Sequence, residues 1–322
     1  MDHEVRQLSS SDKGLLCHLP LSWVPYAELT RLDKPAGFLN VWFPFHLGSL
    51  LAACLQNPTP APASLLMDNI LFFATAFVLR SVGCTWNDII DRDLDRYVAR
   101  CSGRPMARGA LSLQEAYFFL AAQYLIVFAL ALQTPQRCLP FLLAEIATGT
   151  FYPYAKRFTN YAQAILGASL SLEVFFAYCV TRRGPLTLRP LEALVALYSL
   201  AVYWIIWAMI YDTIYAFQDI RDDEKAGIKT MSVRHESHIK PLLYALSVLQ
   251  VSLIIAIAVS ISAGMIFFSG ILGIGCLLLF MIWKIDLSSP RECGWWFKYG
   301  SLLAGGFFTF SLGSEYLKRL SF

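Results

Sequence analysis

The sequence has few charged residues for its length, which removes several classes of protein at once. Only 15% of its 322 residues are charged, 57% are hydrophobic, and the mean hydropathy is +0.52. This composition excludes a soluble enzyme, a disordered chain and a nucleic-acid-binding protein. The formal net charge of +3 is too small to indicate any other polyanionic partner.

Cysteine clusters, glycosylation acceptors and a transit peptide are also missing. The eight cysteines include no CxxC pair and no cluster with histidine, so they indicate neither a disulfide framework nor a zinc site. Asn57 is followed by Pro58, and Asn160 lacks a Ser or Thr two residues later, so neither is a glycosylation acceptor. Because the polar, acidic N-terminus does not resemble an Arg-rich transit peptide, we do not expect mitochondrial import.

What the chain does contain is a series of long apolar segments separated by Pro, Gly and charged residues. Each is close to the roughly 20 residues that a membrane-spanning helix requires. The nine predicted spans cover residues 36–55, 69–86, 113–133, 138–153, 163–181, 191–211, 240–261, 263–283 and 295–316. We therefore predict an all-α, multi-pass protein embedded in the lipid bilayer, with an N-terminal segment over 1–35 and one transmembrane domain over 36–322.

The distribution of Lys and Arg predicts the orientation of this bundle. Nineteen of the 26 basic residues fall in the N-terminal segment and in alternate loops, whereas six fall on the opposite face. Since short cytoplasmic loops are enriched in Lys and Arg, the N-terminal segment and the two long charged loops are expected in the cytoplasm. The C-terminus is then expected across the membrane, in the endoplasmic reticulum or another endomembrane.

The acidic residues are concentrated in two segments on this same cytoplasmic side. The first holds Asp88, Asp91, Asp93 and Asp95, and the second holds Asp212, Asp219, Asp222, Asp223 and Glu224. Asn87, Asp91 and Asp95 recur every four positions, so a continuing helix would place them in one stripe, with Asp88 beside it. Asp212, Asp219 and Asp223 have helical spacings of seven and four. Two acidic stripes are therefore predicted to face one another.

Such a concentration of negative charge requires a compensating cation. A carboxylate at bilayer depth costs on the order of 3 kcal/mol, and Mg²⁺ is bound in proteins by carboxylates together with substrate phosphates. We expect the two stripes to hold Mg²⁺ and, through it, a diphosphate. The predicted metal ligands are Asn87, Asp88, Asp91, Asp95, Asp219 and Asp223. The alternative is a pair of solvated loops whose acids form ion pairs with Arg92, Arg96, Arg100, Arg221 and Lys225.

Basic residues near the stripes would complete a diphosphate site. Arg80 lies seven residues before Asn87, two helical turns deeper on a similar face, where an unpaired guanidinium would be costly. It is predicted to bind phosphate, with a structural ion pair as the alternative. Four other basic residues are within reach of the site, although each alone is typical of a membrane-surface anchor; these are Lys34, Arg104, Lys156 and Lys225.

With these motifs, the sequence resembles the UbiA superfamily of intramembrane prenyltransferases. Residues 87–95 match its NDxxDxxxD motif, residues 219–223 match DxxxD, and Tyr152 to Lys156 match its YxxxK loop. The resemblance implies nine helices around a central cavity and Mg²⁺ held by both aspartate motifs. It further implies a prenyl diphosphate in contact with Tyr152 and Asp212, and an aromatic acceptor that attacks the prenyl carbon. It assigns the catalytic roles to Asn87, Asp91, Asp95, Asp219 and Asp223.

Within the superfamily, the sequence is most similar to eukaryotic 4-hydroxybenzoate polyprenyltransferases and to fungal enzymes that prenylate phenolic acids on the way to meroterpenoids. The absence of a transit-like N-terminus favours the second group. We therefore expect transfer of a farnesyl or similar chain to a carbon of a phenolic acid. Ubiquinone biosynthesis, a membrane terpene cyclase and, outside enzymes, a cation or solute transporter remain the alternatives.

Overall fold

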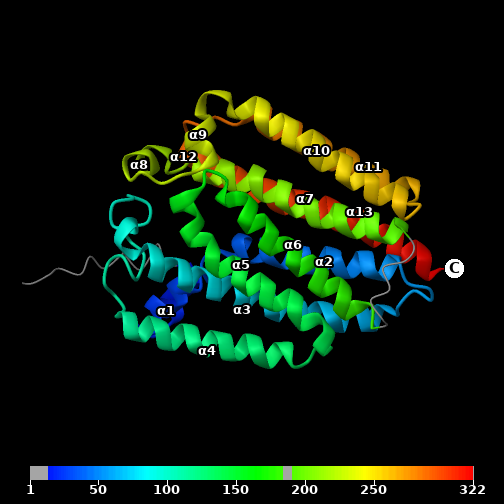
Figure 1. Cartoon of the computed structure of the whole chain (residues 1–322), viewed down its shortest axis with the longest axis horizontal. Helices are drawn as coiled ribbons and strands as arrows, with labels where there is room; N and C mark the ends of the chain where they lie inside the picture. The colour runs from blue at the N-terminus through cyan, green and yellow to red at the C-terminus, as the bar shows by residue number, and fades with distance from the viewer. Residues whose placement is uncertain (1–13, 184–190, 322) are drawn as a thin grey trace, which may run out of the picture.

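The computed structural model describes residues 14–183 and 191–321, and within these ranges the chain is helical with no β-strand. Within the described residues, nine helices of 19 residues or more form the bundle (Figure 1). They are α2 (Pro35–Cys54), α3 (Pro62–Asp95), α4 (Leu113–Ala131), α5 (Leu139–Phe158), α6 (Ala162–Thr181), α7 (Leu191–Ala216), α10 (Ile239–Ser260), α11 (Met265–Lys284) and α13 (Ser301–Leu320). The shorter α-helices are α1 (Val24–Leu29), α8 (Ile220–Lys225), α9 (Met231–His235) and α12 (Pro290–Trp295). The predicted all-α bundle is confirmed.

Seven of the long helices are long and apolar enough to cross a membrane. The two described long helices that do not meet this criterion are α5 and α13, both of which contain charged residues. On α5, Glu145 is buried within the helix, and Lys156 and Arg157 lie in its last turn. The nine predicted spans therefore correspond to nine long helices of the described residues, although two of these helices are less apolar than a typical membrane span.

Helix α3 is much longer than the predicted span over 69–86. Its 34 residues extend about 51 Å at 1.5 Å per residue, whereas a hydrocarbon core of about 30 Å requires roughly 20 residues. The helix begins at Pro62, a residue favoured in the first turn, and continues through Asp95. The last turns of α3, which carry the first acidic motif, therefore extend past the end of an ordinary span.

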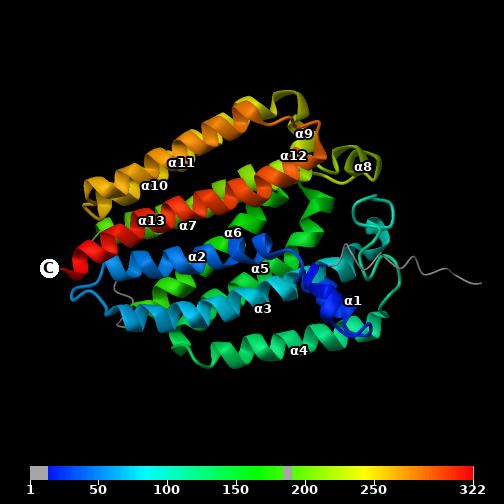
Figure 2. The same cartoon turned by 180° about the vertical axis from the view of Figure 1, so that it is seen from behind.

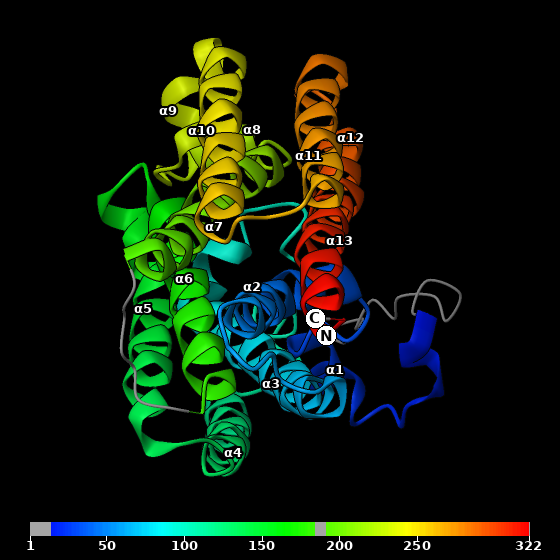
Figure 3. The same ribbon diagram turned by 90° about the vertical axis from the view of Figure 1, so that its right-hand side faces the viewer.

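The centre of the bundle is formed by α2 and α6, which contribute to both hydrophobic clusters of the core. Viewed end-on, α3, α4 and α5 lie to one side of this pair, and α10, α11 and α13 lie to the other (Figure 3). Close approach depends on glycine. A Cβ on Gly48 would lie 2.7 Å from the Val174 carbonyl oxygen, and one on Gly167 would lie 2.5 Å from Ile205 Cα. Small residues bring neighbouring membrane helices together in this way.

The outer helices present large apolar side chains to their surroundings, as expected for contact with lipid. On α4, Phe118 and Leu125 are more than two-thirds exposed, and Trp283 on α11 is equally exposed. The two ends of the bundle differ. Helices α1, α8, α9 and α12 lie at one end, and the C-terminus lies at the other (Figures 1 and 2). This arrangement separates the predicted cytoplasmic segments from the C-terminus.

Candidate active site

The first acidic motif occupies the last turns of α3, where the predicted helical stripe is confirmed. Asp88, Asp91 and Asp95 are buried, with 0%, 8% and 6% of their surfaces exposed, and Asn87 is half-buried. Asp93 lies on the other side of the helix, and its side chain is 69% exposed. The alternative of ion-paired loop acids therefore describes Asp93, and in the second segment Asp219 with Arg100 and Glu224 with Arg221, but not the buried stripe.

Two arginines from outside α3 bind this stripe. Arg31, between α1 and α2, donates to Asp88 Oδ1 over 2.6 Å. Arg104, in the loop after α3, donates to Asp95 Oδ2 over 2.8 Å and to Asp88 Oδ1 over 3.3 Å. Burial alone would lower the pKa of Arg104, but Asp88 and Asp95 outweigh it and the pKa is raised. Arg104 is therefore positively charged and in contact with the first acidic motif, which agrees with its predicted position near the site.

The second motif does not form one helical stripe, which corrects the prediction made from its spacing. Helix α7 ends at Ala216, and α8 begins at Ile220, so a turn interrupts the periodicity. Asp212 lies inside α7, Asp219 precedes α8 in the turn, and Asp223 lies on α8. A four-residue spacing defines a shared face only where the helix is continuous.

The two motifs are nevertheless brought together by the loop that follows α3. Arg100 Nε donates to both carboxylate oxygens of Asp219, over 2.9 and 3.0 Å, and Arg100 Nη1 donates to the Tyr215 hydroxyl over 2.6 Å. The backbone N–H of Ala99 donates to Asp222 Oδ2 over 3.2 Å. Sequence segments more than 100 residues apart therefore meet at one end of the bundle.

Helix α5 supplies the third part of the site. Tyr152 and Lys156 lie in its last turns, so the segment predicted as a loop is helical. The Tyr152 hydroxyl donates to Asp212 Oδ2 over 3.3 Å, and Lys156 Nζ lies 5.1 Å from the Tyr152 ring centroid. The backbone N–H of Lys229, beyond α8, donates to the Lys156 carbonyl over 3.0 Å. The ends of α3, α5 and α7 thus contribute to one polar cluster.

Arg80 lies deeper on α3, against the first turn of α2. Its guanidinium is close enough that a Cβ on Gly37 would lie 2.9 Å from Arg80 Nη2. Its Nε is buried and has no hydrogen-bond partner among the described residues, so an acceptor is missing at this position. Lys34 and Lys225, also predicted to reach the diphosphate, are exposed and form no side-chain hydrogen bond or ion pair within residues 14–183 and 191–321.

The donor chemistry of the cluster fits a hard cation. The Asp91 and Asp223 carboxylates form no hydrogen bond or ion pair with any residue that the structure describes, and Asp88 Oδ2 is buried without a partner. Burial raises the pKa of Asp223 to about 6, with a further contribution from the neighbouring Asp219, because the charged carboxylate loses hydration and lies beside another acid. Oxygen ligands of this kind suit Mg²⁺. Nevertheless, no three acidic, His or Cys side chains of the described ranges are gathered closely enough to enclose an ion by themselves.

Sequence reasoning did not include Arg31 and Arg100 among the site residues. In the sequence, Arg31 is only a near neighbour of Lys34, and Arg100 is one of several bases that could pair with the loop acids. Neither residue has a spacing relation to the acid that it binds, since Arg31 lies 57 positions from Asp88 and Arg100 lies 119 from Asp219. Only the fold could identify these pairs.

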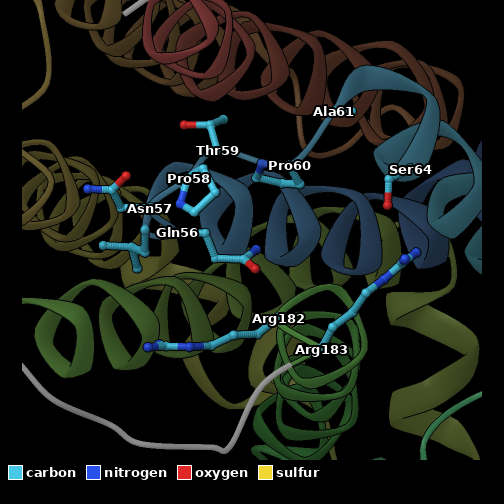
Figure 4. A pocket seen from close by; sticks show the side chains of 10 residues that line it. Gln56, Asn57, Pro58, Thr59, Pro60, Ala61, Ser64, Arg182 and Arg183 are labelled. Carbon is cyan, nitrogen blue, oxygen red and sulfur yellow. The ribbon is translucent and has the colours of Figure 1, made fainter.

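A cavity of about 620 Å³ lies at the other end of the bundle (Figure 4). It is lined by the connection between α2 and α3 and by Arg182 and Arg183 after α6. Because α3 begins here and its acidic motif lies at the far end of the same helix, this cavity is separate from the acidic cluster. The candidate active site is therefore the cluster at the ends of α3, α5 and α7.

Known proteins share both this sequence and this fold. Residues 41–311 match the model of the UbiA prenyltransferase family. The chain is 35% identical to the mitochondrial 4-hydroxybenzoate polyprenyltransferase of Saccharomyces cerevisiae, over 94% of this chain and 79% of that protein. It is also 35% identical to the DMOA farnesyltransferase nvfB of Aspergillus novofumigatus, over 72% of this chain and 71% of that protein.

A solved structure of a UbiA homolog from Archaeoglobus fulgidus, bound to GPP and Mg²⁺, has the same fold with a TM-score of 0.61. It is 18% identical, over 92% of this chain and 100% of that chain. The family model covers most of the chain, and the relatives are named prenyltransferases or farnesyltransferases. The chain therefore belongs to the UbiA prenyltransferase family and is a multi-pass membrane enzyme of the prenyltransferase class.

Proposed function

We propose that this enzyme transfers a farnesyl group from farnesyl diphosphate to a ring carbon of a phenolic acid, in the biosynthesis of a meroterpenoid. The proposal places the active site on the cytoplasmic face of the endoplasmic reticulum or another endomembrane. The single observation that carries it is the link between the two motifs: Ala99 and Arg100, in the loop directly after the buried Asp88–Asp95 stripe, bind Asp222 and Asp219 at one end of the bundle. The name of the fungal farnesyltransferase relative supports the chain length.

The chain's own residues would hold and orient the diphosphate. Arg80 supplies an unpartnered N–H from within the bundle, while Arg104 and Lys156 supply positive charge at the ends of the helices. Charge-assisted hydrogen bonds from such groups are stronger than those between neutral groups. Mg²⁺, held by Asp91, Asp223 and their neighbouring acids, would neutralise negative charge that develops on the departing diphosphate.

Departure of the diphosphate would leave an allylic cation that an electron-rich ring can attack. The acceptor ring forms the new carbon–carbon bond, and loss of its ring proton restores aromaticity. Basic side chains that are already oriented and partly desolvated stabilise the leaving group without reorganising during the reaction. Tyr152, held by Asp212 beside Lys156, would fix the position of the lysine at the phosphate end of the substrate.

A second candidate within the family is 4-hydroxybenzoate polyprenyl transfer for ubiquinone. It is favoured by the 35% identity to the yeast enzyme of that name across 94% of this chain. A terpene cyclase would use the same ionisation step but would need no aromatic acceptor. A cation or solute transporter is disfavoured because the acids lie at helix ends rather than in broken helices near the membrane midplane.

The decisive experiment incubates membranes containing the full chain with Mg²⁺, a series of prenyl diphosphates and a panel of phenolic acids that includes 4-hydroxybenzoate. Mass spectrometry then detects the products. We expect a farnesylated phenolic acid that forms only when the acceptor is present. Hydrocarbon or alcohol formed without acceptor would establish a cyclase instead, and preference for a longer prenyl chain on 4-hydroxybenzoate would establish the second candidate.

A matched pair of variants on α3 tests the site itself. Asp91→Ala removes a buried carboxylate of the stripe, whereas Asp93→Ala removes an exposed carboxylate two residues away. We expect Asp91→Ala to abolish product formation and Asp93→Ala to retain it, with both proteins inserted in the membrane. Equal activity of the two variants would contradict the proposed site.

A further inference from the structure

Two cysteines from different helices are in direct contact in the bundle. Cys138 lies immediately before α5 and Cys179 lies in the last turn of α6, and their sulfur atoms are 2.7 Å apart. Both residues are buried, with 0% and 1% of their surfaces exposed. No other two cysteine sulfurs are in contact within residues 14–183 and 191–321. No sequence pattern indicates this pair, because the two residues are 41 positions apart.

The pair lies at the end of the bundle opposite the active site. Helix α5 starts beside Cys138 and ends at Phe158, next to Lys156, while α6 starts at Ala162 and runs back to Thr181. Each helix has 20 residues and is about 30 Å long, close to the thickness of the hydrocarbon core. In the proposed orientation the aspartates face the cytoplasm. The two buried thiols therefore lie at the exoplasmic end of the bundle, which is on the oxidising side of an endomembrane.

From this geometry we propose that Cys138 and Cys179 are joined by a disulfide bond on the exoplasmic face. A sulfur–sulfur bond is about 2.05 Å long, so a movement of about 0.7 Å between side chains on adjacent, packed helices would close it. The inference does not depend on which isoprenoid or acceptor the enzyme uses. It depends on the orientation of the bundle in the membrane.

The reaction takes place while the chain folds, before the packing of α5 and α6 buries the two thiols, and is a two-step exchange with a small-molecule disulfide such as oxidised glutathione. One cysteine thiolate attacks the external disulfide and forms a mixed disulfide, with release of one external thiol. The second cysteine thiolate then attacks the mixed disulfide and releases the other external thiol. The two cysteines together lose two electrons and two protons, and the external disulfide gains them as two thiols.

The bond would fasten the helix of the active site that is least suited to the membrane. Helix α5 is not apolar enough to qualify as a span, and the only residues buried along it are Leu142, Glu145, Pro153 and Ala155. Its other end carries Tyr152 and Lys156. A covalent link to α6 at the far end restricts the unfolded chain and holds α5 against its neighbour. The proposed role of the bond is therefore to hold α5 at a fixed position along α6.

The bond is tested by mass spectrometry on the full chain in eukaryotic microsomes. Free thiols are alkylated with N-ethylmaleimide under denaturing conditions without reductant, and the protein is digested. We expect the peptides of Cys138 and Cys179 to be joined, with a mass about 2 Da below the sum of the two thiol forms. The exposed Cys276 serves as the internal control and is expected to be alkylated. Alkylation of both Cys138 and Cys179 would overturn the proposal, as would linkage of either to a different cysteine.

Thermal unfolding of the purified protein gives a second, independent test. Dithiothreitol is expected to lower the unfolding midpoint of the native chain by about 5 °C. It should leave the midpoint of the Cys138→Ala/Cys179→Ala variant unchanged, while a Cys276→Ala variant should behave like the native chain. An equal effect of dithiothreitol on the native chain and the double variant would contradict the link. Both readouts are independent of prenyl transfer, so they can fail while the proposed function stands.

Discussion

The contact between Gly37 and Arg80 allows the proposed phosphate-binding arginine to be moved without being removed. A Cβ added at position 37 would lie 2.9 Å from Arg80 Nη2 and 3.1 Å from Nε, whereas ordinary contacts begin at 3.4 Å. The guanidinium must therefore shift by about 0.5 Å or more, away from the first turn of α2. Because the obstructing atoms are the far end of a flexible side chain, we expect Gly37→Ala to leave the fold intact.

The size of the effect follows from the strength of a charge-assisted hydrogen bond. Such a bond contributes about 1.5–3 kcal/mol, so its loss in Arg80→Ala is expected to raise KM for the prenyl diphosphate by about 10- to 150-fold. Gly37→Ala keeps the positive charge of Arg80 but distorts the geometry of its hydrogen bond to the diphosphate. We expect it to raise KM by about 5-fold. In both variants kcat should change little, since the contact is present in the ground and transition states alike.

The assay measures initial rates in membranes at varied prenyl diphosphate concentration, with Gly83→Ala as the matched control. Gly83 lies one turn from Arg80 on the same helix, and a Cβ there would meet no atom within 4 Å. The double variant Gly37→Ala/Arg80→Ala is the critical measurement, because the Gly37 effect should disappear when the arginine is absent. If Gly37→Ala raised KM equally with and without Arg80, or if Arg80→Ala lowered kcat alone, the reasoning would be refuted.

Further outcomes follow from the two motifs and the loop between them. Asp219→Ala should abolish product formation while the protein stays in the membrane, and retained turnover would remove the metal assignment. Because burial and Asp219 raise the pKa of Asp223 to about 6, protons should compete with Mg²⁺ below that pH. The apparent Mg²⁺ affinity should thus fall about tenfold from pH 7 to pH 5; Asp223→Asn should flatten this titration, and an unchanged profile would count against it. Arg100→Met should loosen the loop from Asp219 and Tyr215, seen as faster proteolysis between residues 96 and 112; Arg92→Met, at an arginine that pairs only with Asp93 among the described residues, should not.

The sequence by itself determined the fold class and the residues around which the site is built. Apolar segments of bilayer length can satisfy their backbone hydrogen bonds only as helices, so the all-α bundle follows from composition and segment length. The four-residue spacing of Asn87, Asp91 and Asp95 correctly predicted one helical stripe, because α3 continues unbroken through the motif. Local periodicity is sufficient where a helix is continuous.

The same reasoning failed where the chain bends or where partners are distant in sequence. The turn between Ala216 and Ile220 breaks the second stripe, and the segment from Tyr152 to Lys156 is helical rather than a loop. Helix ends depend on tertiary contacts as well as on local preference, so spacing alone does not locate them.

Tertiary structure alone decided which residues from distant segments come into contact. The pairing of Arg31 with Asp88, the link from Arg100 to Asp219 and the contact between Cys138 and Cys179 all join separate segments. No periodicity relates such residues, because their separation in space is set by how the helices pack and not by their separation along the chain. The sequence supplied the acids, the bases and the thiols; the packing of the helices around α2 and α6 determined their partners.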